Sequence, residues 1–193
     1  MPPKARITRD MILDAAFDLV RTEGHEALNV RTLAKRLGCS TQPILYNFAA
    51  VEELKDAVYQ RADEFHTAYI LPKGGEGADA LLELGLNYVR FGHEEKYLFR
   101  FLFESDRFGG MDFKGLLRWP GSDELVAILA EALGCPAAEA EKLFMTFFAV
   151  AHGLASLLCN NAMEYDETEC AAMLETVFNG ALAALTSKGE EYA

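Results

Sequence analysis

Apolar residues recur at helical spacing through most of the chain. Near the start, five of them fall at i, i+3, i+4, i+7 and i+8, which is one stripe of a 3.6-residue period. They are Ile12, Ala15, Ala16, Leu19 and Val20. Thr8 can cap this helix by accepting a hydrogen bond in its first turn, and Gly24 can take the left-handed conformation that ends a helix. The pattern therefore predicts an amphipathic helix over residues 8–22.

Two short helices are predicted next. Asn29 is a candidate N-cap before a second apolar stripe, which Gly38 ends. The stripe consists of Val30, Leu33, Ala34 and Leu37. Ser40 is predicted to cap a third helix that runs to about Phe48, with Pro43 in its first turn, where proline loses no needed N–H group. Three helices, the last two joined by a glycine turn, indicate a tri-helical helix-turn-helix.

The remaining pattern is helical as well. A fourth helix is predicted over about 51–69, and others over 77–92, 94–105, 122–133, 136–160 and 167–187. Glycine, aspartate and proline make segment 106–121 a predicted loop. The alternating phenylalanines of 98–103 also fit a strand, but their helical neighbours favour a buried helix. We expect an all-α fold, with a helix-turn-helix domain at 1–50 and a larger helical domain at 51–193.

Charge is distributed unevenly between these two parts. The chain has 18 Lys/Arg and 30 Asp/Glu, a net charge of −12. Residues 1–60 hold 8 of each sign, so residues 61–193, with 10 against 22, carry the whole −12. A neutral N-terminal segment with a basic arm (Lys4, Arg6 and Arg9) can still present a positive face to phosphates. The charge thus permits nucleic-acid binding without proving it.

The third helix has side chains suited to reading the major groove. Gln42 and Asn47 can pair with adenine edges, Thr41 can touch a thymine methyl group, and Tyr46 can donate to phosphate. The alternative is a three-helix bundle with no DNA role. On that interpretation, the basic residues of the second helix form only a solvated face; they are Arg31, Lys35 and Arg36.

Residues 8–58 resemble the DNA-binding domain of the tetracycline-repressor (TetR) family. The resemblance rests on residues 8–16 and 28–38, followed at the right spacing by Phe48 and by Glu52-Glu53-Leu54. It implies that Arg31 contacts a guanine or a phosphate. The recognition-helix contacts that it implies are Thr41, Gln42, Pro43, Tyr46 and Asn47. Two positions depart from the family pattern, since Leu45 stands in place of a phosphate-binding tyrosine and Val51 in place of a phosphate-binding lysine.

The resemblance also implies a function. A TetR-type regulator is a cytoplasmic homodimer that binds double-stranded operator DNA and is released by a small-molecule effector. For the dimer interface we expect apolar stripes on the last two long helices. On the last helix these are Leu174, Val177, Ala181, Leu182 and Leu185, and on the one before it Ala151, Ala155, Leu158 and Cys159.

Aromatic residues suggest where an effector could bind. Nine of the aromatic residues lie between Tyr88 and Trp119. An apolar or aromatic ligand could lie among them, and core packing explains them equally well. The candidate ligand-binding residues are Phe91, Tyr97, Phe101, Phe103, Phe108, Trp119, Phe148 and His152. A lone histidine in an apolar helix, such as His152, is more often a packing residue than a ligand contact.

The sequence favours neither a cofactor nor an enzyme. The cysteines, Cys39, Cys135, Cys159 and Cys170, lack metal-ligand spacing, and residues 63–66 hold the only acid-x-x-His spacing. Neither a nucleophile–base pair nor a phosphate-binding glycine loop is recognisable. With no signal peptide and no run of about 18–20 apolar residues, a cytoplasmic location is expected. The rival hypothesis is a helical small-molecule carrier or an enzyme that does not bind DNA.

Overall fold

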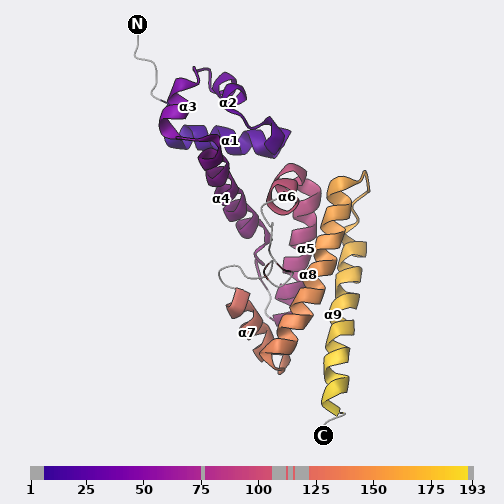
Figure 1. Ribbon diagram of the computed structural model, residues 1–193. Coiled ribbons are helices and arrows are strands. Elements are labelled where there is room, and N and C mark those ends of the chain that lie inside the picture. Colours follow the sequence, from indigo (N-terminus) through magenta and orange to yellow (C-terminus); the bar gives the residue numbers. More distant parts are fainter. Residues whose placement is uncertain (1–6, 75–76, 106–111, 113–114, 116–121, 191–193) are drawn as a thin grey trace. The chain divides into compact units, whose positions relative to one another are not determined.

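The computed structural model describes residues 7–74, 77–105, 112, 115 and 122–190 (Figure 1). Its helices are α1 (Arg9–Glu23), the 3₁₀ turn η1 (His25–Ala27), α2 (Val30–Arg36), α3 (Gln42–Asn47), α4 (Val51–Ile70), α5 (Gly77–Glu94), α6 (Lys96–Phe103), α7 (Ser122–Leu133), α8 (Ala137–Asn160) and α9 (Glu167–Glu190). No strand occurs among the described residues, and the predicted all-α fold is confirmed. Segment 98–103 lies in α6, so its alternating phenylalanines belong to a helix that is buried on more than one side.

The chain forms two compact units, each described here by itself. The first comprises α1, η1, α2, α3, most of α4 and α6; the second comprises α5, α7, α8 and α9. The helix α4 contributes residues to both, since residues up to Ala68 belong to the first unit and Tyr69 begins the second. The predicted boundary at residue 50 separates a DNA-binding domain from a larger helical domain by function, and it stays a prediction.

The core of the first unit is built on the predicted apolar stripe of α1. Ile12, Ala16, Leu19 and Val20 are buried, together with Leu33 of α2, Ile44 of α3 and Leu54, Val58 and Ala62 of α4. The predicted N-caps also form, since the Thr8 hydroxyl accepts a hydrogen bond from the Met11 N–H and the side-chain amide oxygen of Asn29 accepts one from the Thr32 N–H. Sequence patterning therefore predicts both the starts and the buried faces of α1 and α2, whereas Gly24 ends α1 with φ 90° and ψ 163° and not in the predicted left-handed helical conformation.

The start of α3 differs from the prediction. The residue before its first turn is Thr41, in place of the predicted Ser40, and its side chain makes no capping hydrogen bond. Pro43 lies in the first turn, as predicted. Because proline needs no hydrogen-bond partner there, and because its ring fixes φ, the proline can start the helix without a side-chain cap.

In the second unit, α8 packs against α5 and α9 (Figure 1), which also contact each other, and against α7. With a mean hydropathy of 1.6 over 18 residues, it is the one described helix long and apolar enough to cross a membrane. One face of α8 is buried against the other helices of this unit, while its outer face, which includes Ala149, Gly153 and Leu157, is exposed.

The predicted dimer stripes are wrong in several of their residues, because the chain buries those side chains within its own second unit. Leu174 of α9 is fully buried. The four predicted residues of α8 are buried as well: Ala151, Ala155, Leu158 and Cys159. The apolar stripes are buried, as the periodicity indicates, but they are buried by helices of the same chain: α5 packs against both α8 and α9, and α8 and α9 pack against each other. The outer faces of α8 and α9 carry other residues, among them Ala149, Gly153 and Leu157.

Two glycines of α5 permit its close packing on α8. A Cβ atom at Gly92 would lie 2.9 Å from the backbone oxygen and 2.8 Å from the Cβ of Ala155. At Gly85 it would lie 2.5 Å from the ring of Phe147. Real Cβ atoms do not approach other atoms so closely, so the two helices would have to move apart to accept a side chain at Gly92.

We therefore expect Gly92→Ala to destabilise the protein by about 2 kcal/mol, the cost of overpacking a close helix contact. Urea unfolding followed by circular dichroism measures this change. Gly74→Ala is the matched control, because nothing lies within 4 Å of a Cβ atom at Gly74. Equal unfolding midpoints for the two variants would contradict the close contact.

Candidate nucleic-acid interface

The turn between α2 and α3 has the geometry of a helix-turn-helix. The Leu37 N–H donates to the carbonyl of Leu33, and Cys39 then donates to that of Ala34, which closes the end of α2. Gly38 has a φ of +63°, a conformation that side chains disfavour and glycine accepts readily. The predicted need for glycine at this turn is confirmed.

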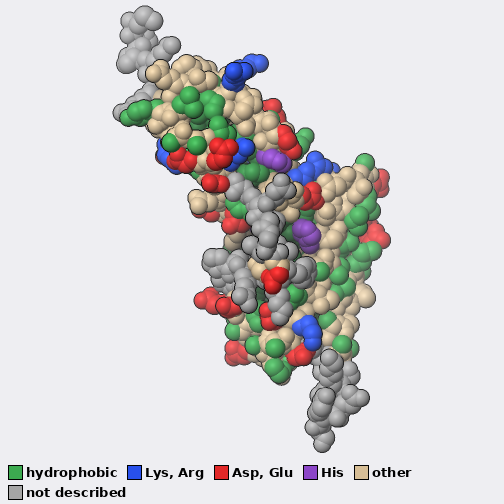
Figure 2. All heavy atoms as spheres, viewed as in Figure 1, with side chains coloured by type: hydrophobic (Ala, Val, Ile, Leu, Met, Phe, Trp, Pro, Cys, Tyr) green, Lys and Arg blue, Asp and Glu red, His purple; other side chains and the backbone are tan. Residues whose placement is uncertain are grey.

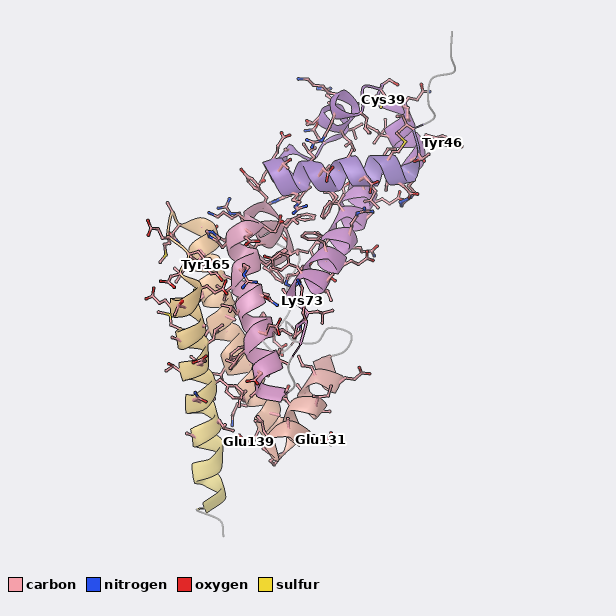
Figure 3. The ribbon with its side chains drawn as sticks, turned by 180° about the vertical axis from the view of Figure 1, so that it is seen from behind. Cys39, Tyr46, Lys73, Glu131, Glu139 and Tyr165 are labelled. Atoms are coloured by element: carbon pink, nitrogen blue, oxygen red, sulfur yellow. The ribbon has the colours of Figure 1, made fainter. Side chains whose placement is uncertain are left out.

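The buried sides of α2 and α3 determine which residues face outward. Leu33 and Ala34 are buried on α2, and Ile44 is buried on α3, with Phe48 directly after it. On a helix of six residues only one side remains for solvent. The residues on that side are Gln42, Leu45 and Tyr46, of which Leu45 is 52% exposed and Tyr46 is 82% exposed. Figure 3 shows Tyr46 at the outer edge of α3.

Not every predicted contact residue is equally exposed. Thr41 and Pro43 are half-buried at the start of α3. Asn47 is half-buried at its end, where the side-chain amide donates a 2.8 Å hydrogen bond to the carbonyl of Pro43. That bond supports the last turn of α3 and uses one of the two N–H groups of the Asn47 amide, which leaves the other N–H and the amide oxygen for an adenine edge.

The basic residues of α2 fall into two groups. Arg36 pairs with Glu23 at 3.1 Å. Arg31 and Lys35, one helical turn apart, are both exposed, and within the described part of the chain no ion pair involves either. Blue basic side chains stand out from the surface of this unit in Figure 2. Arg31 and Lys35 are thus available to bind an anion such as a phosphate.

Arg9 has a structural role in the first unit. Its guanidinium lies 4.1 Å from the centre of the Phe48 ring and 3.0 Å from the Glu53 carboxylate. The other oxygen of Glu53 accepts a hydrogen bond from the Ala49 N–H. These contacts connect α1 to the segment between α3 and α4, and so hold α3 in place.

In the second unit, two of the predicted ligand-binding residues lie side by side. The hydroxyl of Tyr88 on α5 is 2.9 Å from Nδ1 of His152 on α8. The Phe148 ring stacks on His152 with centroids 5.8 Å apart, and meets Tyr88 edge-on at 5.5 Å. His152 and Phe148 are only half-buried, so this aromatic group combines an apolar surface with a polar pair. A third candidate, Phe91, is fully buried and packs against Tyr69.

Three other ligand candidates belong to the first unit. Phe101 is buried and stacks on His25 at 5.6 Å, while Phe103 meets the His66 ring at 5.0 Å. Tyr97 is partly exposed, beside Gly24. Phe108 and Trp119 lie outside the described residues. Among the described residues there is also no group of three His, Cys, Asp or Glu that could hold a metal ion.

The chain is similar to known proteins in part of its sequence and in its fold. No protein-family model matches the chain. It is 31% identical over 78 residues to the class D tetracycline repressor of Escherichia coli, and equally to the class H repressor of Photobacterium damsela subsp. piscicida. These matches cover 40% of this chain and 36% of each relative, so the chain spans about a third of the length of the curated relatives it matches.

Solved structures extend the likeness to nearly the whole chain. A TetR-like transcriptional regulator from Rhodococcus sp. RHA1 superposes with a TM-score of 0.65 at 16% identity, over 92% of this chain and 99% of that one. The fold is that of the TetR-like regulators. A second TetR-family structure, from Rhodococcus sp., agrees with a TM-score of 0.61 at 20% identity, over 90% and 98% of the two chains. The predicted resemblance to the TetR family is confirmed.

Two residues of interest were not among the residues predicted from the sequence. Tyr88 was not among the ligand candidates, yet it contacts both Phe148 and His152. No sequence signal joins residues 60 positions apart. Leu45 was noted only as a lost phosphate contact, although it lies on the exposed face of α3. Its spacing of three from Gln42 could have placed it there.

Proposed function

We propose that this chain is a transcriptional regulator that binds operator DNA as a homodimer and is released by a small apolar or aromatic effector. The observation that carries the proposal is the helix-turn-helix itself, in which α3 exposes Gln42, Leu45 and Tyr46 and α2 exposes Arg31 and Lys35. A short polar helix held by a glycine turn on a three-helix core is the geometry of a major-groove reader. Repression in the cytoplasm is the mode we infer from the likeness to tetracycline repressors.

The distribution of charge along the chain supports DNA binding through the N-terminal part. The acidic excess lies wholly within residues 61–193, while residues 1–60 are neutral. A phosphate backbone would repel the acidic part and accept the neutral segment with its exposed arginine and lysine. Residues 1–60 are therefore better suited than the rest of the chain to approach DNA.

The dimer would use the outer faces of α8 and α9. A shallow, largely apolar groove there is lined by Val150, Glu169, Ala172, Met173, Thr176 and Val177. Leu157, on the outer face of α8, is 51% exposed. Small and apolar side chains on two adjacent helices suit a four-helix interface with a second copy, and a two-fold axis would set two copies of α3 about one DNA turn apart.

The effector would contact the Tyr88–Phe148–His152 group of the second unit. Its stacked and edge-on rings offer an apolar surface, and the Tyr88–His152 pair offers both a donor and an acceptor. These features favour a small aromatic compound with at least one polar substituent.

Arg31→Ala is expected to weaken operator binding by about 2 kcal/mol if the guanidinium contacts a base. The operator would be selected from random duplex DNA, and affinity measured by fluorescence anisotropy over a salt series. Arg36→Ala is the matched control, because Arg36 already pairs with Glu23. An equal loss on unrelated DNA would make Arg31 a phosphate contact. Unchanged affinity at every salt concentration would remove Arg31 from the interface.

A further inference from the structure

Leu45 is an aliphatic side chain on the outward face of α3, next to Ile44, which is buried. On α3, Ile44 is 1% exposed and fills the core, whereas Leu45 is 52% exposed. Leu45 is held in the helix by its own N–H, which donates to the carbonyl of Thr41 at 3.1 Å. Its position outside the core is thus built into the register of α3.

The neighbours of Leu45 on this face point to DNA as the surface that covers it. Gln42 precedes it by one turn, and Tyr46, the most exposed of the large apolar side chains described, follows it. The same helix-turn-helix exposes the cations Arg31 and Lys35. Asn47, at the end of the same helix, has its side chain fixed by a hydrogen bond to the Pro43 carbonyl, so Leu45 lies among side chains of defined position.

An alkyl side chain has one apolar target in the major groove. The edges of adenine, guanine and cytosine present donors and acceptors there, and only thymine adds a methyl group, at C5. A leucine placed against a polar edge would displace water without replacing its hydrogen bonds. Against a methyl group it buries apolar surface on both sides.

We propose that Leu45 reads the C5-methyl group of thymine, so that the operator requires thymine at the position under this side chain. The inference rests on the proposed function and adds the chemistry by which one base is chosen. It also gives a role to Leu45, which stands where the TetR-family pattern has a phosphate-binding tyrosine. Leucine in place of tyrosine exchanges a phosphate contact for a contact with a base.

Replacing thymine by uracil tests this, because uracil pairs as thymine does but lacks the methyl group. Sequences bound by the full chain are selected from random duplex DNA, and the selected duplex is then made with uracil at each thymine in turn. Wild type should lose about fourfold in affinity per contacted methyl, and about 15-fold when both half-sites of a palindrome are changed. Leu45→Ala should bind the thymine and uracil duplexes equally.

Leu71→Ala is the matched control, because Leu71 is 53% exposed but lies in the second unit. It should respond to uracil as wild type does. Equal affinity of wild type for thymine and uracil duplexes would overturn the role of Leu45 and leave the proposed function intact. An equal uracil effect in wild type and Leu45→Ala would assign the methyl contact to another residue. If no sequence is enriched and no duplex is bound, the proposed function fails, and this inference with it.

Discussion

Lowering the pH from 6.5 to 4 is expected to cost the folded protein about 3 kcal/mol of stability through His66 alone. This side chain on α4 is 7% exposed, and its ring packs edge-on against Phe103, 5.0 Å away. Burial lowers the pKa of His66 from 6.5 to about 4. The unfolded chain therefore binds a proton in this pH range that the folded protein does not bind.

The direction of the effect follows from that difference. Above pH 6.5 both states hold a neutral His66, and its contribution to stability is fully present. As the pH falls towards 4, protonation favours the unfolded state by about 1.4 kcal/mol per pH unit. Nearby Asp63 acts in the opposite direction, because burial raises the pKa of its carboxyl group and makes the folded state take up a proton first.

Comparison with His66→Leu isolates the histidine from Asp63 and the other acids. Urea unfolding of both proteins would be measured at several values between pH 4 and pH 7. The difference in unfolding free energy between the variant and wild type should increase steadily in favour of the variant as the pH falls. A constant difference across this range would mean that His66 titrates normally and is accessible to water.

Gly153→Arg is expected to abolish the dimer and to weaken operator binding about 100-fold. Gly153 lies on the outer face of α8, and nothing within 4 Å would meet a Cβ atom there. The protomer should therefore fold normally. A close helix contact with a second copy would not accommodate a long cation, and a monomer loses the avidity of two linked half-sites.

Sedimentation at micromolar concentration and operator titration measure the two effects of this change. Ala127→Arg adds the same charge at an exposed position of α7 and serves as the matched control. It should remain a dimer and bind the operator as wild type does. A Gly153→Arg protein that still sediments as a dimer would place the interface on other helices.

Local structure proved readable from the sequence because its causes are local. The Thr8 and Asn29 caps, the Gly38 turn and the buried stripe of α1 each depend on residues within one or two turns of each other. The all-α fold follows from the same patterns. The Asn47 bond to Pro43 was not predicted, because an asparagine side chain in a helix can either bond to the carbonyl four residues earlier or point outward, and the sequence alone does not decide between the two.

The dimer surface and the aromatic group could not be predicted from hydrophobic periodicity, because they depend on which helices pack together. A stripe such as that around Leu174 shows that a face is covered, but both a neighbouring helix and a second copy can cover it. The concentration of aromatics over 88–119 likewise did not show that Phe101 and Phe91 belong to different compact units. Only the tertiary arrangement brings Tyr88 beside His152.

Selection of binding sites from random duplex DNA by the purified chain tests the central proposal most directly. We expect the enriched sequences to be inverted repeats whose half-sites lie about one helical turn, 34–36 Å, apart. The chain should bind them at least about 1,000-fold more tightly than unrelated DNA at physiological salt. Equal affinity for selected and unrelated duplexes, or no binding to either, would contradict the account.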